Sequence, residues 1–221
     1  MLLRHMDDFV ITGEAQDATW ILQRCKEDLQ LEGTAHLRYE GDAAVILGTR
    51  IVKTKRGFLL SCTVSLLQGI FEQYNLGQAR PLDTTGRQPT PVEAEYAVAL
   101  EKADHRRYRT VVGKLSYAAH VRPDIQFGVN VLARSVGAPT TVNVQAAKHL
   151  IRYLAGSRNV QMRVEPEPVT GSVDKIVLQT YADADWGGDR EDRKSVSGYL
   201  VMIGGAGILS PIRISEPTRP A

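Results

Sequence analysis

The stretch YRTVVGKLSYAAHVRPDIQFGVNVLARSVGAPTTVNVQAAKHLIRYLAGS, residues 108–157, decides the fold class because its apolar residues recur at steps of three and four. The spacing predicts one helix over 124–136 and another over 141–155. A further helical pattern covers 93–119, with an interruption allowed near Asp104. The middle of the chain is therefore expected to be helical.

Strand and helix patterns precede this helical block. An amphipathic helix is predicted over 14–31, and a second one over 63–76 with Ser61 or Thr63 as its N-cap and Gly77 as its terminator. Three stretches rich in Val, Ile, Leu and Phe predict strands at about residues 36–40, 44–53 and 58–62. The first part of the chain should thus combine sheet and helix.

A proline-rich connector follows these elements, and strands return near the end of the chain. Between residues 77 and 92, three prolines, Gly86 and several threonines are compatible with neither a helix nor a central strand. Beyond the helical block, strand patterns cover about residues 159–165, 175–182 and 196–203. Helices and strands in separate regions indicate an α+β fold.

The composition of the 221 residues excludes several classes of protein. Hydrophobic residues make up 43%, which is enough for a buried core and too many for a disordered tail. With 27 basic and 25 acidic residues, the net charge of +2 is too small to identify a nucleic-acid binder. We expect no membrane span and no secretory signal, because no apolar run approaches roughly 20 residues. Cys25 and Cys62 fit neither a disulfide framework nor a zinc cluster, which favours a reducing intracellular compartment.

Two consecutive aspartates, Asp7 and Asp8, interrupt an apolar strand pattern near the start of the chain. Because adjacent strand residues face opposite sides of a sheet, we expect the chain to bend here into a hairpin tip. Two carboxylates at such a tip can join a third from another strand to bind a pair of Mg²⁺ ions for phosphoryl transfer. The alternative is that the pair simply forms the turn, since Asp is a common turn residue.

A second acidic group, Asp183, Asp185 and Asp189, directly follows the apolar run 176–178. Alternating aspartates at the end of a strand suit a hard cation that binds oxygen. A calcium loop is disfavoured because Lys194 stands where a bidentate Glu is needed and because the flanking patterns are strands. The alternative is a solvated acidic loop without a ligand.

Two groups of basic residues suit the phosphates of a nucleic acid. The first group lies at a hairpin turn predicted at Arg56 and Gly57 and consists of Lys53, Lys55 and Arg56. The second group surrounds Tyr108 and consists of Arg106, Arg107, Arg109 and Lys114. The alternative is that these are ordinary solvated cations. The five histidines lack metal-ligand spacing and neither cysteine has a neighbouring His, so we assign them no metal or nucleophile role.

In order along the chain, these motifs resemble the downstream half of the Pol polyprotein of copia-type LTR retrotransposons. HMDDFVITG, residues 5–13, resembles the reverse-transcriptase Asp-Asp motif, and LGTRIVKTKRGFLLS, residues 47–61, resembles the strand pair that follows it. RPLDTT and PTP resemble the family's Pro-Thr linker, and residues 108–157 resemble its connection segment. YADADWGGDREDRKSVSGYLVMIGG, residues 181–205, resembles the opening of its RNase H domain.

The resemblance covers about residues 5–207 and implies RNA-directed DNA polymerase activity with ribonuclease H. It makes Asp7 and Asp8 the polymerase carboxylates and Asp183 the first ribonuclease carboxylate. It implies Mg²⁺ or Mn²⁺ as cofactor, an RNA and DNA template–primer and other Pol segments as partners, and a cytoplasmic particle or the nucleus as location. The resemblance implies that residues 1–80 form the end of the palm with a thumb-like region and that residues 81–160 form a linker with a helical connection. Residues 161–207 would form a truncated RNase H-like sheet, and residues 208–221 a divergent tail.

The chain also departs from the family pattern. His5 stands where the family usually has Tyr, and Asn143 where it commonly has His. The fingers and the first half of the palm would lie upstream of Met1, and the resemblance stops near Gly207, before the remaining ribonuclease carboxylates. We therefore expect two incomplete active sites and an isolated chain without catalytic activity. The alternatives are a nucleic-acid-binding or interaction module without catalysis, and a chain whose open sheet edges promote aggregation.

Overall fold

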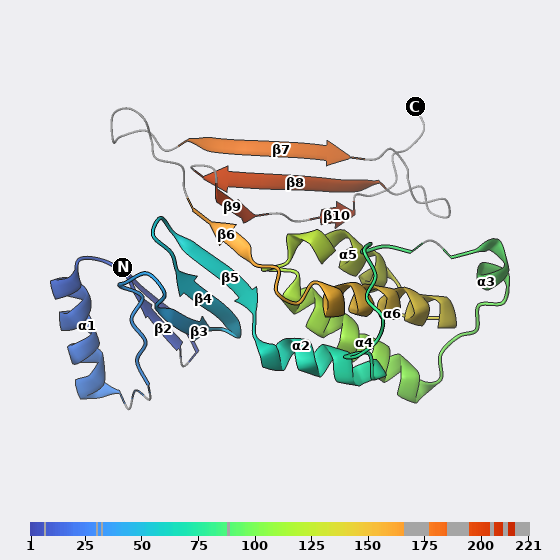
Figure 1. Ribbon diagram of the computed structural model, residues 1–221, viewed down its shortest axis with the longest axis horizontal. Coiled ribbons are helices and arrows are strands. Elements are labelled where there is room, and N and C mark those ends of the chain that lie inside the picture. Colours follow the sequence, from blue (N-terminus) through green and yellow to red (C-terminus); the bar gives the residue numbers. More distant parts are fainter. Residues whose placement is uncertain are drawn as a thin grey trace.

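The computed structural model describes residues 1–6, 8–29, 31, 33–87, 89–165, 177–184, 195–203, 206–209 and 212–214. Helices and antiparallel sheets both contribute to it, in agreement with the predicted α+β class. Figure 1 shows a helical bundle beside a small sheet, with a second sheet along one side of both. Among the described residues, no helix is long and apolar enough to cross a membrane.

The chain begins with a two-stranded hairpin and one helix. Strands β1 (Leu2–His5) and β2 (Asp8–Ile11) pair antiparallel with His5 opposite Asp8, which confirms the predicted bend. Helix α1 (Ala15–Asp28) confirms the helix predicted over 14–31, and it contacts β2. No residue of α1 is fully buried by the described part of the chain.

A four-stranded antiparallel sheet follows, in the order β3-β4-β5-β6. Its strands are β3 (Ala43–Ile46), β4 (Thr49–Lys53), β5 (Phe58–Cys62) and β6 (Met162–Val164). The predicted strand over 44–53 is divided in two because Leu47 and Gly48 adopt positive φ angles of 47° and 66°. The last strand, β6, comes from beyond the helical bundle and completes the sheet at the edge of β5.

The predicted strand over 36–40 is wrong, since these residues form no strand. The carboxylate of Asp42 accepts hydrogen bonds from the backbone N–H groups of Arg38 and Tyr39, at 2.8 Å and 2.7 Å. These local bonds occupy donors that a strand would use for pairing.

Helix α2 (Val64–Phe71) begins at Thr63, whose side chain accepts a hydrogen bond from the Leu66 N–H. The short 3-10 helix η1 (Glu72–Tyr74) continues it. Asn75 ends this segment in the left-handed conformation, with a φ of 54°, so Gly77 is not the terminator.

The long helical prediction over 93–119 is divided as well. A capping box between Thr90 and Glu93, with Pro91 at the first helical position, starts the short helix α3 (Pro91–Glu95). Helix α4 then begins separately (Lys102–Ala118). Between them, Ala99 pairs with Thr140 in an isolated bridge, which holds the intervening chain in an extended form.

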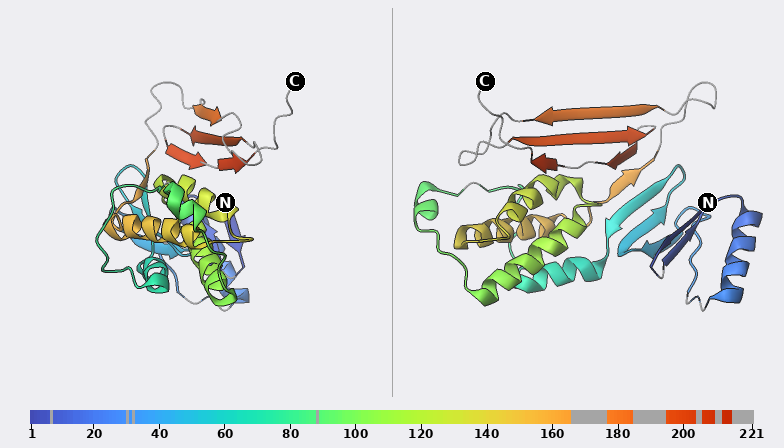
Figure 2. Two further views of the ribbon diagram at one scale, coloured as in Figure 1. Left: turned by 90° about the vertical axis from the view of Figure 1, so that its right-hand side faces the viewer. Right: turned by 180° about the vertical axis from the view of Figure 1, so that it is seen from behind.

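Helices α2, α4, α5 (Gln126–Arg134) and α6 (Thr141–Gly156) pack together and contain the core. The 3-10 turn η2 (Pro123–Ile125) leads into α5, as the proline at this position predicts. The most deeply buried side chains of the cluster include Ile70, Tyr108, Val111, Leu115, Ile125, Leu150, Ile151 and Leu154. Both views of Figure 2 show α4 and α6 crossing within this bundle.

The last sheet is built from strands of the C-terminal region, β7 (Leu178–Ala184), β8 (Val196–Ile203), β9 (Ala206–Leu209) and β10 (Ile212–Ile214). Strand β8 is central and pairs antiparallel with the other three. The strand predicted over 196–203 is confirmed at both ends.

The proline-rich connector lies across α6 instead of projecting from the bundle. Arg152 Nε donates to the Arg80 carbonyl at 2.8 Å, and His149 Nε2 lies 2.9 Å from the Thr84 carbonyl. The same nitrogen lies 3.0 Å from Thr84 Oγ1, so both polar oxygens of Thr84 face the His149 ring. The connector approaches α6 so closely that a Cβ at Gly156 would lie 2.7 Å from Cβ of Pro81.

Replacement of Gly156 by Ala is expected to destabilise the protein by about 1 kcal/mol, because the clash with Pro81 exceeds the gain in helix propensity. Gly113→Ala is the matched control, since no described atom lies within 4 Å of a Cβ at this exposed position of α4. That control should stabilise by about 0.5 to 1 kcal/mol. Thermal unfolding followed by circular dichroism measures both, and equal stabilisation by the two substitutions would show that the connector does not rest on α6.

Candidate functional site

Asp8 is the first residue of β2 and its side chain is exposed at the end of the hairpin. Met6, which follows β1, has a positive φ of 51°. Asp7, the other predicted polymerase carboxylate, lies outside the described residues. The hairpin prediction is therefore confirmed, while the metal-binding role of Asp7 and Asp8 stays a prediction.

Asp183 lies near the end of β7, opposite Gly198 of β8, and is also exposed. Its Oδ1 accepts a hydrogen bond from the Ala184 N–H at 2.9 Å. Asp185 and Asp189, the other members of this acidic group, lie outside the described residues. Strands β2 and β7 belong to different sheets, and no metal-binding group among the described residues contains Asp8 or Asp183.

The described residues do not provide a complete divalent-cation site. Carboxylates suit Mg²⁺ or Mn²⁺, but nowhere in the described ranges do three or more Asp, Glu, His or Cys side chains gather in a metal-binding arrangement. Asp8 and Asp183 alone therefore do not make the two-ion site expected for phosphoryl transfer.

The basic residues of the β4–β5 hairpin differ in role. Lys53 Nζ donates to the Thr54 carbonyl at 2.9 Å and lies 5.1 Å from the centre of the Phe58 ring, so it closes the turn. Lys55 and Arg56 are exposed at the tip. The turn between paired Lys53 and Phe58 confirms the predicted hairpin.

The basic residues of α4 also fall into two kinds. Lys114 Nζ donates to the Gly69 carbonyl at 2.8 Å and thereby joins α4 to α2. Arg107 lies 3.6 Å from an Asp104 carboxylate oxygen and 5.9 Å from the centre of the Tyr74 ring. Arg106 and Arg109 are exposed on another part of the helix surface.

Arg106 and Arg109 line an open concavity of about 480 Å³ together with Lys102, His105 and Thr110. Neither Lys102 nor His105 belongs to the two basic groups predicted from the sequence. The spacing of Lys102, Arg106 and Arg109, at steps of four and three, is the signal that could have placed them on one helix face.

A larger open groove of about 930 Å³ lies between the β4–β5 strands, α2 and the segment after α6. Its polar lining consists mainly of side-chain amides and two arginines, including Arg50, Gln68, Gln78, Arg158, Asn159 and Gln161. Arg158 is already engaged, since its guanidinium donates to the Gly77 carbonyl at 2.9 Å and lies 5.2 Å from the centre of the Phe71 ring. Cys62 also lines the groove, and burial raises the pKa of its thiol, which disfavours a thiolate nucleophile.

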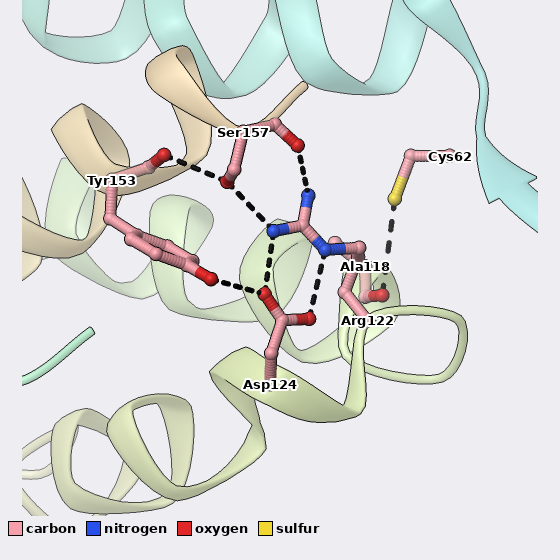
Figure 3. A network of polar contacts seen from close by, with 6 residues as sticks. All are labelled: Cys62, Ala118, Arg122, Asp124, Tyr153 and Ser157. Carbon is pink, nitrogen blue, oxygen red and sulfur yellow. Dashed lines mark hydrogen bonds and ion pairs between the residues drawn. The ribbon is translucent and has the colours of Figure 1, made fainter. Parts of the chain in front are cut away.

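Figure 3 shows a polar network around Arg122, whose residue is only 1% exposed. Its Nε and Nη2 donate to the two carboxylate oxygens of Asp124 at 2.9 Å and 2.6 Å. Nη1 donates to the Ser157 carbonyl at 2.9 Å, and Nη2 to Ser157 Oγ at 2.8 Å. Tyr153 completes the network by donating its hydroxyl to Asp124 at 2.8 Å.

The network joins the turn before α5 to the end of α6. Burial would raise the pKa of the Asp124 carboxyl, but the hydrogen bonds from Arg122 and Tyr153 outweigh burial and hold the pKa below its ordinary value. Asp124 therefore stays ionised beside the guanidinium. We assign these residues a structural role, because the guanidinium and both carboxylate oxygens are used within the network.

Asn143, one of the departures from the family pattern, has a structural place at the start of α6. Its Oδ1 accepts from the Thr140 N–H at 2.7 Å, and its Nδ2 donates to Ser135 Oγ at 3.0 Å. The amide thus caps the helix, which explains why Asn is well suited to this position.

No protein-family model and no solved structure matches the chain. Among known proteins, it is similar to the retrovirus-related Pol polyprotein from transposon RE1 of Arabidopsis thaliana, with 32% identity over 92% of this chain. It is also similar to the Pol polyprotein from transposon TNT 1-94 of Nicotiana tabacum, with 30% identity over 94% of the chain. An uncharacterized mitochondrial protein of Arabidopsis thaliana is 26% identical over 98% of the chain and is matched along 84% of its own length.

The RE1 and TNT 1-94 relatives are both retrovirus-related Pol polyproteins from transposons. The chain is related to the Pol polyproteins of copia-like retrotransposons over most of its length, which confirms the resemblance read from its motifs. It spans 13% of the RE1 polyprotein and 15% of the TNT 1-94 polyprotein, so it corresponds to a segment of such a protein.

Proposed function

We propose that the chain acts as a segment of an RNA-directed DNA polymerase with ribonuclease H, of the copia type. The observation that carries the proposal is the similarity to Pol polyproteins over 92% or more of the chain. In this proposal, residues 1–80 form the end of the palm and a thumb-like region, 81–160 the linker and connection, and 161–207 the start of the RNase H-like unit. In this proposal, the chain functions in a cytoplasmic particle or in the nucleus.

In the proposed function, Asp7 and Asp8 serve the polymerase site and Asp183 serves the ribonuclease site. The exposed position of Asp8 at the end of a hairpin supports this assignment, because a group at such a place is accessible to a nucleic acid. Any Mg²⁺ or Mn²⁺ site needs further carboxylates beyond Asp8 and Asp183, which other Pol segments would supply.

The remaining contribution of the chain is to hold a template–primer. Lys55 and Arg56 at the tip of the β4–β5 hairpin, and Arg106 and Arg109 on α4, are exposed cations that suit phosphates. The same four residues favour the second candidate function, a nucleic-acid-binding module without catalysis.

The purified chain alone is expected to show no template-dependent incorporation with Mg²⁺ or Mn²⁺. Its described residues bring no three metal-binding side chains together, and a site short of ligands stabilises the transition state poorly. Primer extension on an RNA template measures this. Incorporation that Asp8→Ala abolishes would contradict the expectation.

A chimera tests the polymerase proposal itself. In this experiment, the chain replaces the matching segment of the RE1 Pol polyprotein, and we expect template-directed synthesis that Asp8→Asn reduces about 100-fold or more. The control is Asp28→Asn at the exposed end of α1, which should leave synthesis unchanged. A chimera that folds and binds template–primer, yet synthesises equally with Asp8 or Asn at this position, would refute the proposal.

A further inference from the structure

We propose that Lys102, Arg106 and Arg109 form one phosphate-binding strip on α4, which holds consecutive backbone phosphates of a nucleic-acid strand. This inference rests on the proposed function and specifies how the chain grips its polymer. The three cations stand at steps of four and three along the helix, and all line the concavity of about 480 Å³. Such spacing places side chains on one face.

The charge of the strip is not compensated locally. All three side chains belong to exposed residues, and within the described ranges none of them forms an ion pair. Two acids lie near the strip at the start of α4: Asp104 is paired with Arg107 at 3.6 Å, and Glu101, the N-cap residue, forms no ion pair with the strip in the described part of the chain. Three uncompensated positive charges on one face attract a polyanion and release its counterions when it binds.

The strip rests on a rigid support. Tyr108, on the opposite face of α4, is fully buried and donates its hydroxyl to the Leu132 carbonyl at 2.7 Å. His105, at the edge of the concavity, donates Nε2 to the Val136 carbonyl at 2.8 Å. The first bond anchors α4 on α5, and the second anchors it on the turn that follows α5. Binding therefore orders only the flexible arginine and lysine ends.

The dimensions suit a run of phosphates. With a rise of about 1.5 Å per residue, Lys102 and Arg109 are separated by about 10.5 Å along the helix axis. One strand of a duplex presents a phosphate about every 3.4 Å along its axis, so about three phosphates fall within this length. The guanidinium groups of Arg106 and Arg109 can each bind a phosphate through two hydrogen bonds.

The strip should bind without sequence preference. Among the residues that the structure describes, the concavity is lined by Lys102, His105, Arg106, Arg109 and Thr110, and none of these is a Phe, Tyr or Trp on which a base could stack. Thr110 Oγ1 donates to the Arg106 carbonyl at 3.1 Å, so its hydroxyl hydrogen is not available to a base edge. Phosphate contacts without base contacts position a strand but do not read it.

Fluorescence anisotropy with a labelled 20-base-pair RNA–DNA hybrid, measured at several salt concentrations with EDTA and without nucleotides, tests the strip. Arg106→Gln and Arg109→Gln should each weaken binding about five- to eightfold at 0.1 M salt and lower the slope of log K against log salt by about 0.7 to 0.9. Arg107→Gln is the matched control, since it removes the same charge from the same helix at a residue already paired with Asp104.

The proposed phosphate-binding strip would be refuted if the three substitutions had equal effects, or if none of them changed the slope of log K against log salt. Displacement of the hybrid by millimolar inorganic phosphate at constant ionic strength would identify a site for free phosphate and would overturn it as well. Thermal unfolding of each variant verifies that the helix is intact. The readout contains no catalysis, so a failed polymerase chimera leaves this result unchanged, and a failed strip leaves the polymerase proposal standing.

Discussion

Gly57→Ala is expected to destabilise the protein by about 3 kcal/mol, because the new methyl group has no room at the tip of the β4–β5 hairpin. A Cβ at Gly57 would lie 2.1 Å from the Val164 carbonyl oxygen and 2.9 Å from Cα of Glu165. Both atoms belong to backbone, so they cannot rotate away as a side chain would. The pairing of β5 with β6 must open or shift to admit the methyl group.

Urea unfolding followed by circular dichroism measures this effect as a lower midpoint. The matched control is Gly86→Ala in the connector, where no described atom lies within 4 Å of the added Cβ. The control should change stability by less than about 0.5 kcal/mol. Equal midpoints for Gly57→Ala and the unsubstituted chain would mean that β6 does not close the sheet over Gly57.

Replacement of Arg122 by Met is expected to cost about 3 kcal/mol, because it removes the cation from a buried network and leaves its partners behind. The Asp124 carboxylate loses two hydrogen bonds, and Ser157 loses donors to its carbonyl and hydroxyl oxygens. The Asp124 side chain is 30% exposed, so water compensates part of the loss and the lower end of the range for broken buried pairs applies.

The same network predicts a pH dependence. The pKa of Asp124 in the folded protein lies below the ordinary value of 3.8, so its ionised form stabilises the fold above that value. This stabilisation is lost as the pH falls below 3.8 and through the depressed pKa. Urea unfolding at pH 7 and pH 3 should show that Arg122→Met costs less at the lower pH. A cost that is the same at both values would refute the assigned coupling, and the double variant with Asp124→Asn separates pairing from packing.

Local sequence patterns predicted several of the helices and strands well. The strand over 58–62 and the strand over 196–203 have the expected bounds, because alternation and composition are local properties. Local side-chain bonds caused the main errors. The Asp42 carboxylate ties up the backbone near 36–40, and the Thr90–Glu93 capping box starts a separate short helix ahead of α4.

The candidate site was predictable in part for a related reason. The hairpin that carries Asp8 could be predicted from the apolar residues on both sides of the aspartates. The charge of the basic residues, by contrast, did not show which groups each of their side chains contacts. Lys53 and Lys114 turn toward backbone carbonyls and serve the fold, whereas Lys102 was overlooked and lies beside Arg106 and Arg109. Only tertiary packing separates these two kinds of basic residue.

The position of β6 has a consequence for the order of events during synthesis on the ribosome. Phe58 pairs with Val164, roughly one hundred residues later in the chain. The edge of β5 that binds β6 therefore stays unpaired until all four bundle helices have been synthesised. Closing so long a loop also slows folding. A nascent chain stalled before residue 162 would expose that edge to other chains, so we expect chaperone dependence to be greatest at this stage.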